Sequence, residues 1–127
     1  MQPRQQHDAV VVLDDSHGRG VIGGTERGLP KVFGVEGQVD ILTGKLGKTR
    51  GAGTGGFVAG LQSVSDTLTQ VSRPYLFSNS LTPAVAGSGL AAFRVLRENP
   101  RMISELGEKI RYFRDGLLAR GIQPLDG

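Results

Sequence analysis

The chain has 127 residues, a formal net charge of +3 and no cysteine. This suits a single domain and excludes disulfide bridges and thiolate metal sites. Its basic residues are scattered along the sequence, which argues against a dedicated nucleic-acid domain. No apolar run reaches the ~18 residues of a membrane span. The polar N-terminal stretch is not a signal peptide, so the sequence predicts a soluble, intracellular protein.

Three short apolar runs predict strands. Residues 9–15 form a continuous β-branched run that ends in two acids, as in a strand buried on both faces of a parallel sheet. Residues 39–44 and 55–60 are shorter runs of the same kind. Helical patterns follow them, and this mixture predicts an α/β fold with mostly parallel strands.

The helical patterns cover residues 61–72, 82–98 and 99–121. The last is the clearest, because Asn99 can cap it and Gly121 sits where a helix-terminating glycine belongs. We expect its apolar stripe to face a core. The stripe consists of Met102, Leu106, Ile110, Phe113 and Leu117. Three short strands and three helices nevertheless predict a small core. We expect the alternating pattern of strands and helices to be interrupted at both ends of the sequence.

A glycine-rich basic loop, TGKLGKTRGAGTGG, occupies residues 43–56. A phosphate-binding loop of the nucleotide-triphosphatase type needs a glycine five residues before the Gly47-Lys48-Thr49 triplet, and that position is Leu42. A flexible linker is disfavoured because strand-like runs adjoin the loop on both sides. A reactive lysine is the reading that remains, with non-specific binding of anions or nucleic acid as the open alternative.

Titratable side chains follow the first predicted strand, where open α/β sheets place their ligand sites. Asp14, Asp15 and His17 lie there in the segment LDDSHG. A carboxylate that holds a protonated pyridine nitrogen, a histidine and a Schiff-base lysine are the parts of a pyridoxal phosphate (PLP) site. Each part has a structural alternative: the acid pair could be a helix cap or a salt bridge, and the histidine could be structural.

The sequences of three segments are more specific than these separate residues. VLDDSHGRGVIG, DILTGKLGKTRGAGTGG and SRPYLFSNSLTPAV together resemble the α-oxoamine synthases, PLP enzymes that condense an amino acid with an acyl-CoA. DDSH and RPYLFSNSL are most similar to the glycine C-acetyltransferase branch. The resemblance implies a fold-type-I, aminotransferase-like α/β fold. It implies a partial PLP-binding large domain over residues 1–98, without its N-terminal strands. A connecting helix over 99–121 and the start of a C-terminal domain at 122–127 would follow.

The resemblance also implies roles for individual residues. Lys48 matches the Schiff-base lysine, Asp14 the partner of the pyridine nitrogen, and His17 the partner of the ring oxygen. Ser78 and Asn79 are implied to serve the phosphate bound in the other subunit of a homodimer. The wider cofactor-binding set also includes Asp15, Ser16, Lys45, Leu46 and Gly47. No metal site is implied.

Two positions depart from the family pattern. Lys45 stands where threonine is usual, and Arg50 where a small or aliphatic residue is usual. The implied activity is condensation of glycine with acetyl-CoA to 2-amino-3-ketobutyrate and CoA, in the cytoplasm or in a eukaryotic mitochondrion. Since the family's substrate pocket lies mostly outside the matched segment, the isolated chain is expected to be an inactive fragment. The alternatives are a short non-catalytic paralogue that acts as a dimerisation or regulatory partner, and an anion or nucleic-acid binding module.

Overall fold

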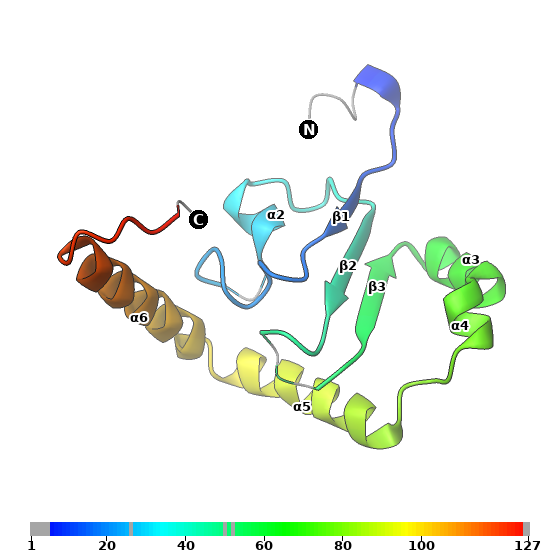
Figure 1. Ribbon diagram of the computed structural model, residues 1–127. Helices are drawn as coiled ribbons and strands as arrows, with labels where there is room; N and C mark the ends of the chain where they lie inside the picture. The colour runs from blue at the N-terminus through cyan, green and yellow to red at the C-terminus, as the bar shows by residue number, and fades with distance from the viewer. Residues whose placement is uncertain (1–5, 26, 50, 52, 126–127) are drawn as a thin grey trace.

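The computed structural model describes residues 6–25, 27–49, 51 and 53–125. Among these residues, three strands and five helices have defined bounds, and their order along the chain can be followed by colour in Figure 1. In chain order they are β1 (Val12–Asp14), α2 (Leu29–Val32), β2 (Ile41–Lys45), β3 (Gly56–Gly60), α3 (Gln62–Val71), α4 (Arg73–Phe77), α5 (Pro83–Glu98) and α6 (Arg101–Leu118).

The strands form one sheet in the order β1-β2-β3. β1 pairs with β2 in parallel, with Asp14 opposite Thr43, and this confirms the predicted α/β class. β3 instead pairs with β2 antiparallel, with Lys45 opposite Gly56, so parallel pairing was the wrong expectation for this strand. The reason is the connection: its described residues contain no helix, and residues 46–55 are too few for a parallel return, which needs a crossover of about a dozen residues or more.

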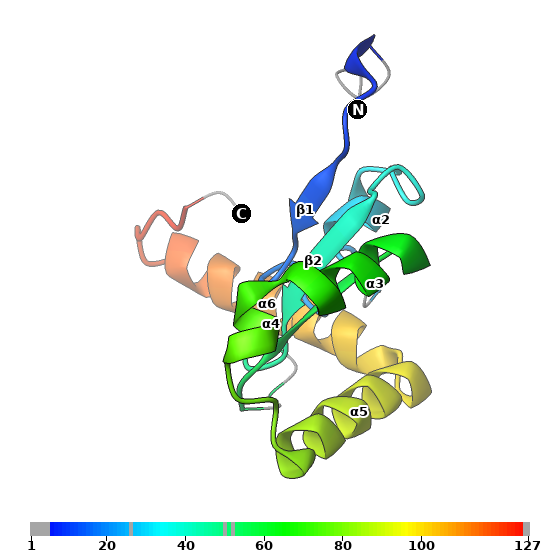
Figure 2. The same cartoon turned by 90° about the vertical axis from the view of Figure 1, so that its right-hand side faces the viewer.

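The predicted helices lie close to where the apolar spacing placed them, as α3, α5 and α6. Two short helices, α2 and α4, were not predicted. Each has a proline in its first turn, Pro30 and Pro74, where a missing N–H costs little and the fixed φ suits a helix. α4 follows α3 after the single residue Ser72, which has an extended backbone. In Figures 1 and 2, α3 and α4 lie beside β3, on the opposite side of the sheet from α2.

The helix ends are defined by local hydrogen bonds. Gly121 takes a left-handed φ of 73°, and its N–H donates to the carbonyl of Leu118 while that of Ile122 donates to Leu117. These two bonds complete the C-terminal glycine motif that the sequence predicts. Asn99 does not cap α6. Its Nδ2 donates to the Val95 carbonyl 2.9 Å away at the end of α5, because the backbone is already helical at Pro100.

The core is small. Among the described residues, Leu46, Ile103 of α6 and Pro30 of α2 are the buried nonpolar residues apart from glycine. Leu46 packs on Gly89 of α5, where an added Cβ would lie 3.3 Å from Leu46 Cδ1. Phe57 of β3 meets Phe93 of α5 edge to face, with ring centroids 6.0 Å apart.

The apolar stripe of α6 does not face a core in the described part of the chain. Met102, Leu106, Ile110 and Phe113 are between 36% and 65% exposed. The expectation of a buried stripe is therefore wrong for this chain, because α6 leads away from the sheet (Figure 1). No helix among the described residues is long and apolar enough to cross a bilayer.

Candidate functional site

Two neighbouring carboxylates at the end of β1 have opposite environments. Asp14 is exposed, whereas Asp15 is only 1% exposed, because successive residues of a strand point to opposite faces. The Oδ1 atom of Asp14 accepts the backbone N–H of Ser16 at 2.9 Å. The backbone N–H of Asp15 donates to Thr43 of β2 at 3.0 Å, which ties the start of the following turn to the neighbouring strand.

The environment of Asp14 favours its charged form. Hydrogen bonds from Ser16, first from the hydroxyl and then from the backbone N–H, hold the pKa of Asp14 below its usual value. The positive charges of Lys45 and Lys48 lower this pKa further. Asp14 is therefore an anion at neutral pH. Because its pKa is lower in the folded chain than in the unfolded chain, its stabilising contribution is present above the ordinary aspartate pKa and is lost as pH falls through the lowered value.

Ser16→Ala is expected to raise the pKa of Asp14 toward its ordinary value, because the substitution removes the hydroxyl hydrogen bond and keeps the backbone N–H. A carbon NMR titration of the Asp14 carboxyl group measures this shift. Lys48→Ala is the comparison, and a smaller upward shift is expected from it because Lys48 is the weakest of these influences. An Asp14 pKa that Ser16→Ala leaves unchanged would contradict this assignment.

His17 and Lys48 meet although they are far apart in the sequence. Nζ of Lys48 contacts Nε2 of His17, and both side chains are exposed. His17 lies in the turn after β1 and Lys48 in the turn after β2, so parallel pairing of the two strands brings the turns to one edge of the sheet. Thr49 Oγ1 also donates to the carbonyl of Arg19 at 2.8 Å, which joins the same two turns.

These side chains surround a cavity of about 330 Å³ at the carboxyl ends of β1 and β2, the usual position for ligands in open α/β sheets. The cavity contains six of the predicted site residues. It is lined by Asp14, Asp15, Ser16, His17, Gly18, Leu29, Lys45 and Lys48. The sequence pattern alone missed Gly18 and Leu29, because no motif marks their approach to the site.

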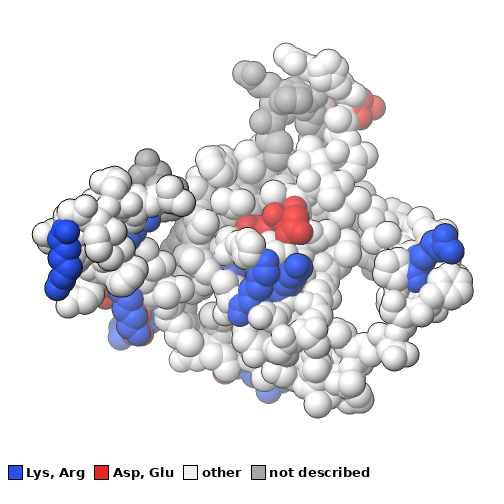
Figure 3. Space-filling model, viewed as in Figure 1, with Lys and Arg blue, Asp and Glu red and all other residues white. Residues whose placement is uncertain are grey.

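A larger cavity of about 840 Å³ adjoins the first and shares Asp14, Ser16 and Lys45 with it. It lies between the sheet and the α3–α4 pair, with Phe57, Leu68 and Tyr75 among its apolar walls and Ser78 at its edge. In Figure 3 basic and acidic side chains sit next to each other near the middle of the visible face, and the other basic groups are separate. The described residues on that face form no continuous basic stripe of the kind that binds nucleic acid.

The other predicted site residues lie outside the smaller cavity. Leu46 is buried against α5, and Gly47 packs so closely that an added Cβ would lie 2.4 Å from the carbonyl oxygen of Gly53. Ser78 borders the larger cavity, whereas Asn79 is exposed and lines neither. Arg50 lies outside the described residues.

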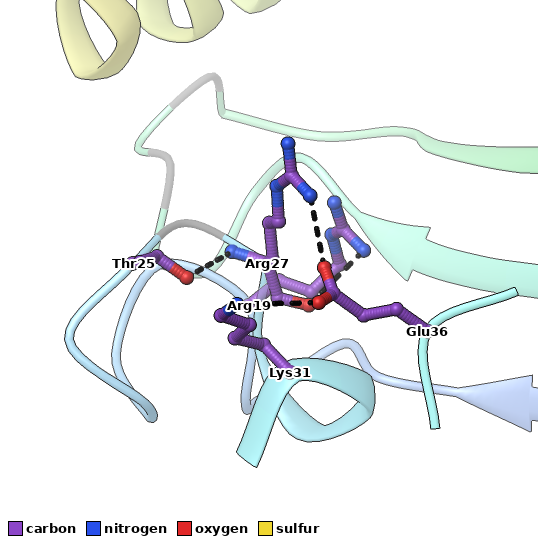
Figure 4. A network of polar contacts seen from close by, with 5 residues as sticks. All are labelled: Arg19, Thr25, Arg27, Lys31 and Glu36. Carbon is purple, nitrogen blue, oxygen red and sulfur yellow. Dashed lines mark hydrogen bonds and ion pairs between the residues drawn. The ribbon is translucent and has the colours of Figure 1, made fainter. Parts of the chain in front are cut away.

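The loop between His17 and β2 is fastened by a surface network, shown in Figure 4. Glu36 accepts from Arg27 at 2.9 Å and pairs with Lys31 at 3.4 Å. These cations hold the pKa of Glu36 below its usual value, with the Arg27 hydrogen bond as the largest cause. Arg27 in turn accepts from Arg19 Nη1 through its carbonyl, and its N–H donates to Thr25. Because these groups are exposed, the network holds the conformation of the loop but contributes little to the free energy of folding.

The arrangement suits carbonyl chemistry. A primary amine beside an imidazole can attack an aldehyde, and a nearby anionic carboxylate can hold a developing positive charge. No group of three or more metal-ligating side chains was found in the described ranges.

Comparison with known proteins gives one matching family and several similar enzymes. The model of the family described as "Aminotransferase class I and II" matches residues 2–127. The chain is 40% identical over 116 residues to 2-amino-3-ketobutyrate coenzyme A ligase of Escherichia coli K12, covering 91% of this chain and 29% of the relative. It is 38% identical over 117 residues to 8-amino-7-oxononanoate synthase of Thermosipho melanesiensis, covering 92% and 30%. Both relatives are α-oxoamine synthases, as the sequence resemblance implies.

Solved structures agree with this placement. The serine palmitoyltransferase of Sphingomonas wittichii superposes with a TM-score of 0.83 at 31% identity, covering 91% of this chain and 29% of that one. A serine palmitoyltransferase from S. paucimobilis with bound PLP and myriocin gives 0.82 at 30% identity, covering 93% and 30%. The fold-type-I expectation is thereby confirmed. The chain spans about 30% of the length of the relatives it matches.

Proposed function

The chain belongs to the aminotransferase class I and II family, and we propose that it forms the central part of a PLP-dependent acyltransferase of the α-oxoamine synthase type. One observation carries the proposal. Lys48 and His17, which are 31 residues apart in the sequence, meet in a cavity that also contains the anionic Asp14. This brings together the amine, the imidazole and the carboxylate that the chemistry requires.

The residues present fit the cofactor. When bound, PLP would supply an electron sink for a negative charge at the amino acid's α-carbon. Lys48 provides the primary amine for the cofactor's aldehyde, and Asp14 provides the anion for its ring nitrogen. His17 can donate to a ring oxygen. Lys45, the last residue of β2, lines both cavities and offers the phosphate a point charge where the family has a hydroxyl.

The two histidines of the chain allow a matched test of this site. His17→Gln is expected to weaken PLP binding, because it replaces the imidazole that contacts Lys48 and that can donate to a ring oxygen. His7→Gln changes an exposed histidine outside both cavities and is expected to leave the affinity unchanged. The visible absorbance band that grows on addition of PLP measures the affinity.

Equal affinities in the two histidine variants would contradict the site. The absence of any band in the parent chain would favour a non-catalytic partner protein.

For the finer assignment, we propose glycine and acetyl-CoA as substrates. This rests on the sequences of the DDSH and RPYLFSNSL segments and on the similarity to the E. coli ligase. Release of CoA with glycine and acetyl-CoA, compared with larger amino acids and longer acyl-CoAs, tests this choice.

We also propose that the segment after α4 serves a partner subunit, with Ser78 and Asn79 directed to the cofactor phosphate there. Support comes from α4, where Tyr75, Leu76 and Phe77 are 66%, 48% and 79% exposed just before Ser78. Such neighbouring apolar side chains are typical of a surface that another chain covers. Phe77→Ser is expected to shift the chain toward monomer in sedimentation equilibrium. A parent chain that is monomeric at all concentrations would overturn this part of the proposal.

A further inference from the structure

Asp15 is a buried carboxylate for which the proposed chemistry has no use. It is 1% exposed and holds three segments together. Its N–H donates to Thr43 of β2, its carbonyl accepts from Arg19 at 3.3 Å, and its Oδ2 accepts the N–H of Leu29, the first residue of α2, at 3.0 Å. His17 lies inside the turn that these bonds close.

Two glycines fix the place of this carboxylate. A Cβ added to Gly18 would lie 2.2 Å from Oδ1 of Asp15, and one added to Gly28 would lie 2.1 Å from Oδ2. No Cβ atom approaches so closely in a real protein, so both positions require glycine while Asp15 keeps its place. The carboxylate therefore occupies a slot that leaves its side chain little freedom.

The slot is energetically costly, because Oδ1 of Asp15 is buried and accepts no hydrogen bond. A buried acceptor without a partner destabilises a fold, and such groups call for a specific explanation. The same side chain forms part of the wall of the smaller cavity, beside His17 and Lys48. Its position in this wall connects the energetic cost of the buried Oδ1 atom with the candidate site.

We propose that Asp15 is a positioning residue for the reactive amine: its buried carboxylate fixes the turn that holds His17 against Lys48. The inference rests on Lys48 being the reactive amine of the proposed function. Asp15 itself acts only through His17. It differs in this from Asp14, which is exposed, lines the cavity and would itself hold the ring nitrogen of a bound cofactor.

A matched pair of variants tests the proposal in the full 127-residue chain. Asp15→Asn changes the buried carboxylate. Asp40→Asn makes the same change in a carboxylate that also accepts a backbone N–H, from Val11 at 2.8 Å, but outside both cavities. The first readout is the rate at which an amine-reactive reagent modifies Lys48, with Lys109 as the internal reference. The second is the nitrogen NMR signal of the His17 ring, with His7 as its reference.

Asp15→Asn is expected to change the Lys48 rate about threefold or more and to shift the His17 signals. Asp40→Asn is expected to change neither. In a His17→Gln background, Asp15→Asn should have no further effect on Lys48, which a merely structural role would not produce. If circular dichroism shows that Asp15→Asn does not fold, Asp15→Ser, which keeps a small acceptor, is measured in its place.

Two results would overturn the proposal. One is an equal effect of the Asp15 and Asp40 variants on Lys48. The other is an Asp15→Asn effect that persists in full without His17. Since no PLP is added, either result stands apart from failure of the proposed function, which the absorbance titration detects.

Discussion

A Gly28→Ala chain is expected to unfold about 3 kcal/mol more easily than the parent chain. Two effects add at this position. Gly28 has a φ of +68° and a ψ of −147°, a backbone conformation that is essentially restricted to glycine and that costs another residue about 1–3 kcal/mol. The new Cβ would also lie 2.1 Å from Oδ2 of Asp15 and 2.9 Å from Cγ of Arg19, so the buried carboxylate would have to move. Urea unfolding followed by circular dichroism measures the loss.

Gly34→Ala is the matched control for this prediction. Gly34 also has a left-handed φ, of +61°, but an added Cβ there meets no atom within 4 Å. Its cost should be the conformational one alone. The difference between the two variants therefore reports the clash with Asp15 together with the backbone strain at the ψ of −147° of Gly28. Equal losses of unfolding free energy would show that the slot around Asp15 does not contribute to the stability of the fold.

Lys48→Ala is expected to abolish the visible band that PLP produces with the parent chain, because a covalent bond to the cofactor's aldehyde needs this amine. The folded state should be unaffected, since the Lys48 side chain is exposed. Lys109→Ala removes an exposed lysine of α6 that lies outside both of these cavities, and its band should match that of the parent. Absorbance titration of the three chains makes the comparison.

Lys45 provides the alternative outcome. It lines the same cavity as Lys48, three residues earlier, and stands where the family pattern has threonine. A band that persists in Lys48→Ala and disappears in Lys45→Ala would move the reactive amine to Lys45. The cavity would then be correct and the residue assignment wrong.

Most of the fold follows from local sequence patterns. The three apolar runs became strands, and the three periodic segments became α3, α5 and α6, because residue periodicity reports which faces can be buried. The predictions failed where contacts between residues distant in the sequence determine the structure. The direction of β3 depends on how residues 46–55 return, and the exposure of the α6 stripe depends on what packs beside it. Asn99 could cap either of two adjacent helices, and the local sequence does not distinguish between them.

In the site, too, the features set by local sequence could be predicted and those set by distant contacts could not. Asp14 and His17 could be placed together because they lie three residues apart at the end of one strand, and Lys48 joins them because the strand before it pairs with β1 in parallel. The burial of Asp15 could not be predicted beside the exposure of Asp14. It depends on Leu29 and on two glycines that are close only in the folded chain.

The most direct test of the central claim is to reduce the parent chain with borohydride in the presence of PLP and map the adduct by peptide mass spectrometry. The chain has four lysines, Lys31, Lys45, Lys48 and Lys109, so the outcome is unambiguous. A single adduct on Lys48 is the result that the structure predicts. Adducts spread over all four lysines, or one on a lysine outside the cavity, would show that the chain has the family's fold without its cofactor site.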